Sequence, residues 1–94
     1  MKILWSSLAI DHLISVRAHI AKDNPRAAQR MAAKILISVE SLALHPHLGR
    51  PGRVTGTREL VVPDTPYILP YRIHKNAAEI IAVFHGRQRW PELL

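Results

Sequence analysis

Four side chains near the middle and the end of the chain are of types that could perform acid–base chemistry on a phosphate ester. They are Arg58, Glu59, Arg72 and His85. Cleavage of RNA without a metal needs a base for the 2′-hydroxyl, an acid for the leaving 5′-oxygen and cations around the phosphate. His85 could serve as acid or base, Glu59 as base, and the two arginines as phosphate clamps. These residue types are common and scattered, so a solvated ion pair at Glu59 and an ordinary polar histidine are the alternative.

The C-terminal segment offers a second kind of candidate, a binding surface rather than a reaction centre. Arg87, Arg89 and Trp90 follow the last predicted strand, and Pro91 interrupts any regular continuation. Arginine and tryptophan are enriched among the residues that dominate the energetics of protein interfaces. We expect one of two arrangements. Either Trp90 folds back onto the helices as core, or the segment stays exposed and presents both arginines beside Trp90 to a target.

Histidine and cysteine usage gives little support for a metal site. His45 and His47 lie in one loop, but no third ligand follows at a diagnostic spacing, and solvent exposure accounts for His12 and His19. Cysteine is absent, which excludes a disulfide framework, a thiolate zinc site and a cysteine nucleophile. The sequence also lacks a Gly-rich phosphate loop and a nucleophile elbow. We therefore expect neither a metal nor a cofactor.

Length and composition indicate one folded domain over residues 1–94. Hydrophobic residues make up 48% of the chain and charged residues 21%, which is typical of a globular domain and excludes a disordered tail. Thirteen Lys and Arg against seven Asp and Glu give a net charge of +6, and nine of the cations are arginine. Such a charge favours nucleic acid or an acidic protein as partner. No apolar run suits a membrane span or a signal peptide, so we expect a cytoplasmic protein.

A short apolar strand at residues 2–5 and two amphipathic helices are predicted in the first half of the chain. Ser6 and Ser7 offer N-cap hydroxyls to the first helix, after which apolar residues recur at spacings of three and four. Asn24-Pro25 begins the second helix, because asparagine caps a helix and proline fits its first position. This helix should end before Pro46. The short connection between the helices predicts an antiparallel hairpin.

A small sheet is predicted after a Pro- and Gly-rich loop at residues 45–56, where the apolar period changes from 3.6 to 2. Its strands are Thr57–Val62, Tyr67–His74 and Glu79–His85. If Lys75–Ala78 forms the last loop, His74 pairs with Glu79. One face then carries Leu69, Tyr71, Ile73, Ile80, Ala82 and Phe84, and the other carries Arg72, His74, Glu79 and His85. The fold class is therefore α+β, with the helix hairpin packed on the apolar face of a mainly antiparallel sheet.

Seven short phrases occur in a recognisable order along the chain. They are Trp5-Ser6 with Ala9 and Asp11, Asp23-Asn24-Pro25-Arg26-Ala27-Ala28, His45-Pro46, Gly49-Arg50-Pro51-Gly52-Arg53, Gly56-Thr57-Arg58-Glu59-Leu60, Tyr71-Arg72-Ile73, and His85-Gly86-Arg87-Gln88-Arg89-Trp90-Pro91. Together they resemble the RelE/ParE superfamily of bacterial toxins from type II toxin–antitoxin systems, over nearly the whole length. The fold shared by that superfamily is the one that the apolar pattern predicts.

The resemblance implies a toxin that a cognate antitoxin neutralises through a disordered C-terminal segment, in a hetero-oligomer without membrane contact. ParE-like members bind DNA gyrase and stop replication, whereas RelE-like members cleave mRNA in the ribosomal A site. We favour the ParE-like branch. The helix phrases and the ending after His85 resemble it more closely, and the lysine cluster and late tyrosine of RelE-like nucleases are missing. The alternative is a ribosome-dependent mRNA endonuclease that uses Arg58, Arg72 and His85.

Overall fold

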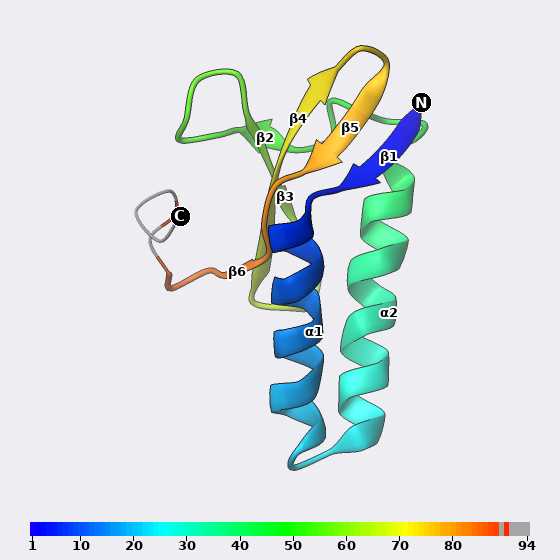
Figure 1. Cartoon of the computed structure of the whole chain (residues 1–94), viewed down its shortest axis with the longest axis vertical. Coiled ribbons are helices and arrows are strands. Elements are labelled where there is room, and N and C mark those ends of the chain that lie inside the picture. The colour runs from blue at the N-terminus through cyan, green and yellow to red at the C-terminus, as the bar shows by residue number, and fades with distance from the viewer. Residues whose placement is uncertain (89, 91–94) are drawn as a thin grey trace.

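Two helices lie side by side along the long axis of the molecule (Figure 1). The computed structural model describes residues 1–88 and 90, and within these residues α1 spans Ser7–Ala21 and α2 spans Pro25–Ser41. The two helices run in opposite directions and form the predicted hairpin. Neither helix has the length and hydropathy that crossing a bilayer requires.

Both helices begin at the residues that the sequence predicts. The Ser6 hydroxyl oxygen accepts a hydrogen bond from the backbone N–H of Ala9 at 3.0 Å. The Asn24 side-chain oxygen likewise accepts from the backbone N–H of Ala27 at 3.0 Å, and Pro25 occupies the first helical position. Each cap satisfies a backbone donor that has no partner inside the helix. Both helices of the hairpin therefore begin at signals that lie within a few residues of one another in the sequence.

Six strands lie within the described residues and form one sheet. They are β1 (Lys2–Trp5), β2 (Arg50–Pro51), β3 (Arg58–Val61), β4 (Tyr67–His74), β5 (Ala77–Ile80) and β6 (Phe84–His85). The order across the sheet is β1-β5-β4-β3-β2, and β6 pairs with the beginning of β4. β1 runs parallel to β5, and the remaining pairs among these strands are antiparallel. The predicted α+β class is confirmed, and β2 is an addition within the segment predicted as loop.

The hairpin between β4 and β5 is tighter than predicted. His74 lies opposite Ala77 rather than Glu79, and Arg72 lies opposite Glu79. The loop consists only of Lys75-Asn76, whose φ angles of 48° and 60° are both left-handed, as two-residue hairpin turns of type I′ require. The predicted register was therefore wrong by two positions. An even shift keeps every side chain on its predicted face of the sheet.

The main core lies between the helices and one face of the sheet, which we call the helix face. Its buried members are Ala9, Ile35, Val39, Leu42, Leu60, Val62, Tyr67, Leu69, Tyr71, Ala78, Ile80 and Val83. Leu69, Tyr71 and Ile80 were predicted on this face, and Ile73 packs against the cluster as a partly buried residue. The prediction of a core face is confirmed for these four residues.

Ala82 and Phe84 do not belong to this core, contrary to the prediction. Ile80 lies opposite Tyr71, but Phe84 lies opposite Ile68, so one extra residue has been inserted between β5 and β6. An insertion of one residue exchanges the two faces, because side chains alternate along a strand. Ala82 and Phe84 therefore form a second cluster with Trp90. By this alternation the cluster belongs to the other side of the sheet, which we call the far face, although the Phe84 ring also meets the His12 ring of α1 with centroids 5.3 Å apart.

Candidate functional site

Glu59 is the centre of a polar network on the far face. Its carboxylate oxygen Oε1 accepts hydrogen bonds from Arg50 Nη2 at 3.0 Å and Nε at 3.2 Å. Oε2 accepts from the indole N–H of Trp90 at 2.9 Å and from the backbone N–H of Arg53 at 3.1 Å. The Glu59 side chain is only 3% exposed. One buried carboxylate thus ties β2, the loop after β2 and the C-terminal segment to β3.

These contacts decide the protonation state of Glu59. Burial alone raises the pKa of this carboxyl group, but hydrogen bonds from Trp90, the Arg53 backbone and Arg50 outweigh burial, and the pKa lies below its ordinary value of 4.5. A carboxylate with a lowered pKa and occupied lone pairs is a weak proton acceptor. To act as the base considered above, Glu59 would first have to release these donors. The geometry assigns it a structural role.

We expect the stability of the fold to fall in acid because of Glu59. Its pKa in the folded state lies below the unfolded value, so the ionised carboxylate stabilises the fold above a pH of about 4.5. That contribution is lost as the pH falls through the folded-state pKa. Urea unfolding measured between about pH 3 and 7 should show the decline, and the Glu59→Gln variant should show a shallower one. Equal slopes for both proteins would contradict this expectation.

Trp90 is buried on the far face, and it packs on neither of the helices. Its ring stacks on Phe84 with centroids 6.2 Å apart and an interplanar angle of 27°. Arg53 Nη1 also donates to its backbone carbonyl at 3.4 Å. With 6% of its surface exposed, Trp90 anchors the segment and has little area for a target. Arg87 is exposed, whereas Arg89 lies outside the described residues.

Arg58 and Arg72, the two expected phosphate clamps, lie on opposite faces of the sheet. Arg58 is paired with Tyr71 and therefore shares the helix face with it. Arg72 is the next residue along β4, so it lies on the far face. There Arg72 Nε donates to Glu79 Oε1 at 2.9 Å, and Nη2 forms an ion pair with the same oxygen at 2.8 Å. The sheet itself separates the two guanidinium groups.

His85 lies toward the other end of β4. It pairs with Tyr67, and the two rings meet edge to face with centroids 5.9 Å apart. Its Nδ1 accepts the backbone N–H two residues further on at 3.2 Å. Tyr67 is four residues from Tyr71, which is about 13 Å along a strand at about 3.3 Å per residue. The described residues therefore do not bring His85, Arg58 and Arg72 to one point.

Arg50 and Arg53 are site residues that the sequence analysis missed. They lie in the Pro- and Gly-rich segment, whose residues the sequence predicts as a loop and which carries part of the family resemblance, with no role expected for either side chain. Their side chains are 54% and 51% exposed although both approach Glu59. The signal available in the sequence was the placement of two arginines on either side of Pro51-Gly52, ahead of an acidic residue in a strand. Across residues 1–88 and 90, no three side chains of His, Cys, Asp or Glu are placed to share a metal ion.

Comparison with known proteins identifies the family. Residues 3–90 match the family described as the ParE toxin of the type II toxin–antitoxin system parDE. The chain belongs to this toxin family. It is 47% identical over 93 residues to the toxin candidate Y4kP of Sinorhizobium fredii, and the alignment covers 99% of this chain and 96% of the relative. It is 34% identical over 85 residues to the toxin RelE2 of Caulobacter vibrioides, and the alignment covers 90% of this chain and 94% of that relative.

A solved structure supports the same assignment at the level of the fold. The toxin fold superposes on a chain of the chromosomal ParDE toxin–antitoxin system from P. aeruginosa with a TM-score of 0.81. The match covers 90% of this chain and 95% of the other, at 24% sequence identity. The two chains thus share the helix hairpin on a mainly antiparallel sheet.

Proposed function

We propose that this ParE-family toxin inhibits growth by binding DNA gyrase in the bacterial cytoplasm, so that replication stops without a reaction catalysed by the toxin. The observation that carries the proposal is the dispersal of Arg58, Arg72 and His85. Arg58 lies on the helix face, Arg72 on the far face, and His85 beside Tyr67. Nuclease activity requires an acid, a base and phosphate clamps around one bond. A binder has no such requirement.

The proposed partner that neutralises the toxin is a cognate antitoxin with an acidic C-terminal segment, disordered until it binds and held in a hetero-oligomer. The net charge of +6 attracts such a segment. The outer surfaces of the helices and the turn after α2 add apolar contacts, because Ile14, Ile37 and Leu44 are 60%, 71% and 82% exposed. An amphipathic segment that folds on this surface would bury these side chains. The P. aeruginosa relative comes from a ParDE toxin–antitoxin system.

The proposed contact with gyrase includes the C-terminal segment. Trp90 is docked against Glu59 and Phe84, so it holds the segment in place rather than reaching a target. Arg87 is exposed beside it, and Arg89 follows two residues later in the sequence. Arginine suits the rim and the anchor positions of protein interfaces alike. We assign target contact to Arg87 and Arg89, and the positioning of both to Trp90.

The second candidate function is cleavage of mRNA on the ribosome with Arg58, Arg72 and His85. The observation in its favour is the 34% identity to the toxin RelE2. This function would require the three side chains to be drawn together when the toxin binds the ribosome. It therefore predicts that each of them is essential, whereas the gyrase proposal predicts that none is.

Two assays on the same purified protein separate these functions. We expect inhibition of gyrase supercoiling and intact mRNA on programmed ribosomes. Arg72→Ala and His85→Ala should leave the inhibition unchanged, and Arg87→Glu should weaken it without altering thermal stability. Cleavage of ribosome-bound mRNA that is abolished in Arg72→Ala and His85→Ala would replace the proposal by the nuclease alternative. Failure in both assays, with no toxicity on induced expression, would leave only an antitoxin-binding module.

A further inference from the structure

Arg58 differs from the other arginines in the strands of the described sheet because it forms no ion pair with a described carboxylate. Arg50 and Arg72 form ion pairs with Glu59 and Glu79. Within the part of the chain that the structure describes, no carboxylate lies within ion-pair distance of Arg58. The carboxylate of Glu59, its neighbour in sequence, lies on the far face and is occupied by other donors. Arg58 therefore carries an uncompensated positive charge on the helix face.

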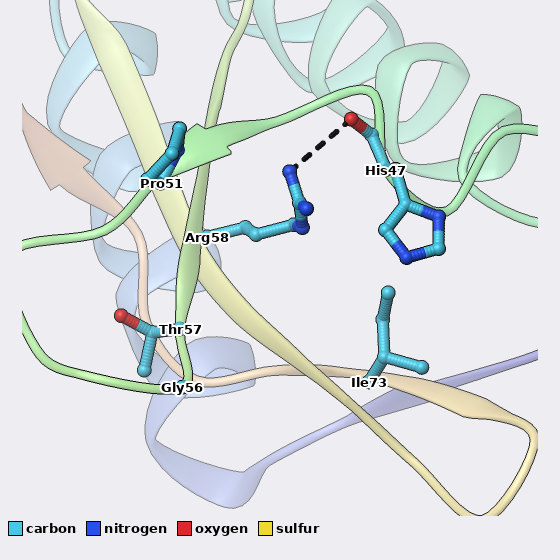
Figure 2. A pocket seen from close by; sticks show the side chains of 6 residues that line it. All are labelled: His47, Pro51, Gly56, Thr57, Arg58 and Ile73. Atoms are coloured by element: carbon cyan, nitrogen blue, oxygen red, sulfur yellow. Dashed lines mark hydrogen bonds between the residues drawn. The ribbon is translucent and has the colours of Figure 1, made fainter.

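The Arg58 guanidinium is nevertheless held in a fixed orientation. Its Nη1 donates to the backbone carbonyl of Gly49 at 2.8 Å. It also donates to the backbone carbonyl of His47 at 3.4 Å, the dashed line in Figure 2. Among the described residues, its Nε and Nη2 have no hydrogen-bond acceptor. These two nitrogens form one planar edge of the guanidinium, the edge that receives both oxygens of a carboxylate in bidentate pairs. The protein thus orients the group through one nitrogen and leaves its binding edge available.

This edge belongs to a pocket of about 250 Å³. Figure 2 shows Arg58 extending between the loop that carries His47 and the strand that carries Ile73. Pro51 and Ile73 supply apolar wall, and the His47 ring lies beside the guanidinium as a second polar group. Apolar walls lower the local dielectric and so strengthen a charged hydrogen bond formed inside them. The pocket is suited to one small anionic group.

We propose that this pocket binds a carboxylate side chain from the acidic segment of the antitoxin, an inference that rests on the proposed function and gives it a specific contact. The occupant is a carboxylate because one arginine edge with one imidazole matches a single planar anion. A nucleic acid would need several cations in a row along its phosphates, and among the described residues that line the pocket only Arg58 and His47 are basic. The carboxylate completes the ion pair that the toxin lacks on this face.

The test introduces a competing carboxylate at the pocket. His47→Glu places one beside Arg58 and leaves the anchoring contact intact, because that contact uses the backbone carbonyl of His47. His45→Glu is the matched control: it is an exposed histidine in the same loop, with the same change of charge, and it does not line the pocket. Dissociation constants are measured against the purified antitoxin encoded by the neighbouring gene. We expect His47→Glu to bind at least about tenfold more weakly than His45→Glu.

Arg58→Lys provides a second variant that keeps the positive charge but loses the planar edge. It should also bind the antitoxin more weakly, because an ammonium group cannot make the bidentate contact. Equal affinities of all variants, with tight binding by the unmodified toxin, would overturn the pocket proposal alone. Absence of binding by the unmodified toxin would overturn the antitoxin proposal as well. An effect of His47→Glu only on a duplex DNA oligonucleotide would show a phosphate site and reject the proposal.

Discussion

Glu59→Ala is expected to lower the free energy of unfolding by about 3 kcal/mol, a large share of the stability of a small domain. The substitution removes a buried acceptor and leaves the Trp90 indole N–H and the Arg53 backbone N–H without their partner. It also removes the carboxylate that joins the loop after β2 to the C-terminal segment, so that of these contacts only the one from Arg53 Nη1 to the Trp90 carbonyl is left between them. Urea unfolding followed by circular dichroism measures the change, and Trp90 fluorescence should report release of the ring before global unfolding.

The control for this experiment is Glu59→Gln, which preserves the shape of the side chain and one acceptor oxygen. It should cost about half as much, because the remaining oxygen can still accept two of the four hydrogen bonds, whereas the amide NH2 cannot accept the other two. A loss below about 0.5 kcal/mol for Glu59→Ala would mean that the network contributes little to stability. Glu59 would then again be available for the chemical role considered from the sequence.

Gly49→Ala is expected to destabilise the fold to a similar extent, by about 3 kcal/mol. A Cβ at this position would lie 2.5 Å from Cε1 and 2.8 Å from the hydroxyl oxygen of Tyr71, and 2.9 Å from the Glu59 carbonyl oxygen. Tyr71 is fully buried and cannot withdraw, and its hydroxyl donates to the Pro46 carbonyl at 2.7 Å while accepting the Gly49 N–H at 2.9 Å. Burial raises the pKa of this hydroxyl above 10.0, so it stays protonated and remains a donor.

Gly56→Ala is the matched control for this steric effect. Gly56 has a left-handed φ of +84°, but no atom lies within 4 Å of an added Cβ. We expect a cost of about 1 kcal/mol from backbone strain alone. Thermal or urea unfolding of both variants decides the matter. Similar losses of unfolding free energy in the two variants would mean that the steric conflict with Tyr71 does not determine the effect of Gly49→Ala.

Local signals in the sequence were sufficient for the helices and for the longest strand. Ser6 and the Asn24-Pro25 pair start the helices with caps formed by residues three positions apart, so a short window of sequence contains both partners. β4 spans Tyr67–His74, the predicted bounds, because Pro66 and the turn before it limit the strand on one side and Lys75-Asn76 on the other. Where the determinants lie within a few residues, prediction succeeds.

The hairpin register and the second cluster depend on geometry that residue types express weakly. A lysine and an asparagine form the β4–β5 turn with positive φ, although glycine is the usual residue in its second position. The insertion between Ile80 and Phe84 follows no glycine or proline signal in an otherwise apolar segment. The inserted residue depends on tertiary contacts. Val83 packs in the main core on the helix face, and its N–H donates to His12 Nδ1 at 3.1 Å.

The candidate site was the least predictable part of the molecule. The sequence identified Glu59 as chemically significant, but its role depends on Trp90, which is 31 positions away and joins it across the far face. Proximity in sequence also suggested that Arg58 and Glu59 act together. Alternation along β3 separates them onto opposite faces, with different partners for each. The residue type of Glu59 indicated that it is important. Its structural role depends on the packing of segments that are distant in the sequence.

The parallel pairing of β1 with β5 has a consequence for the order of events during protein synthesis. Lys2 lies opposite Ala77, so β1 receives its partner only after both helices and the strands β2, β3 and β4 have been translated. Pairings of such high contact order form slowly, because the intervening chain must be ordered before the contact forms. A nascent chain that ends before β5 can hold the helix hairpin, with β1 and the apolar helix faces still uncovered. The sheet of the folded toxin therefore forms only after β5 has been translated.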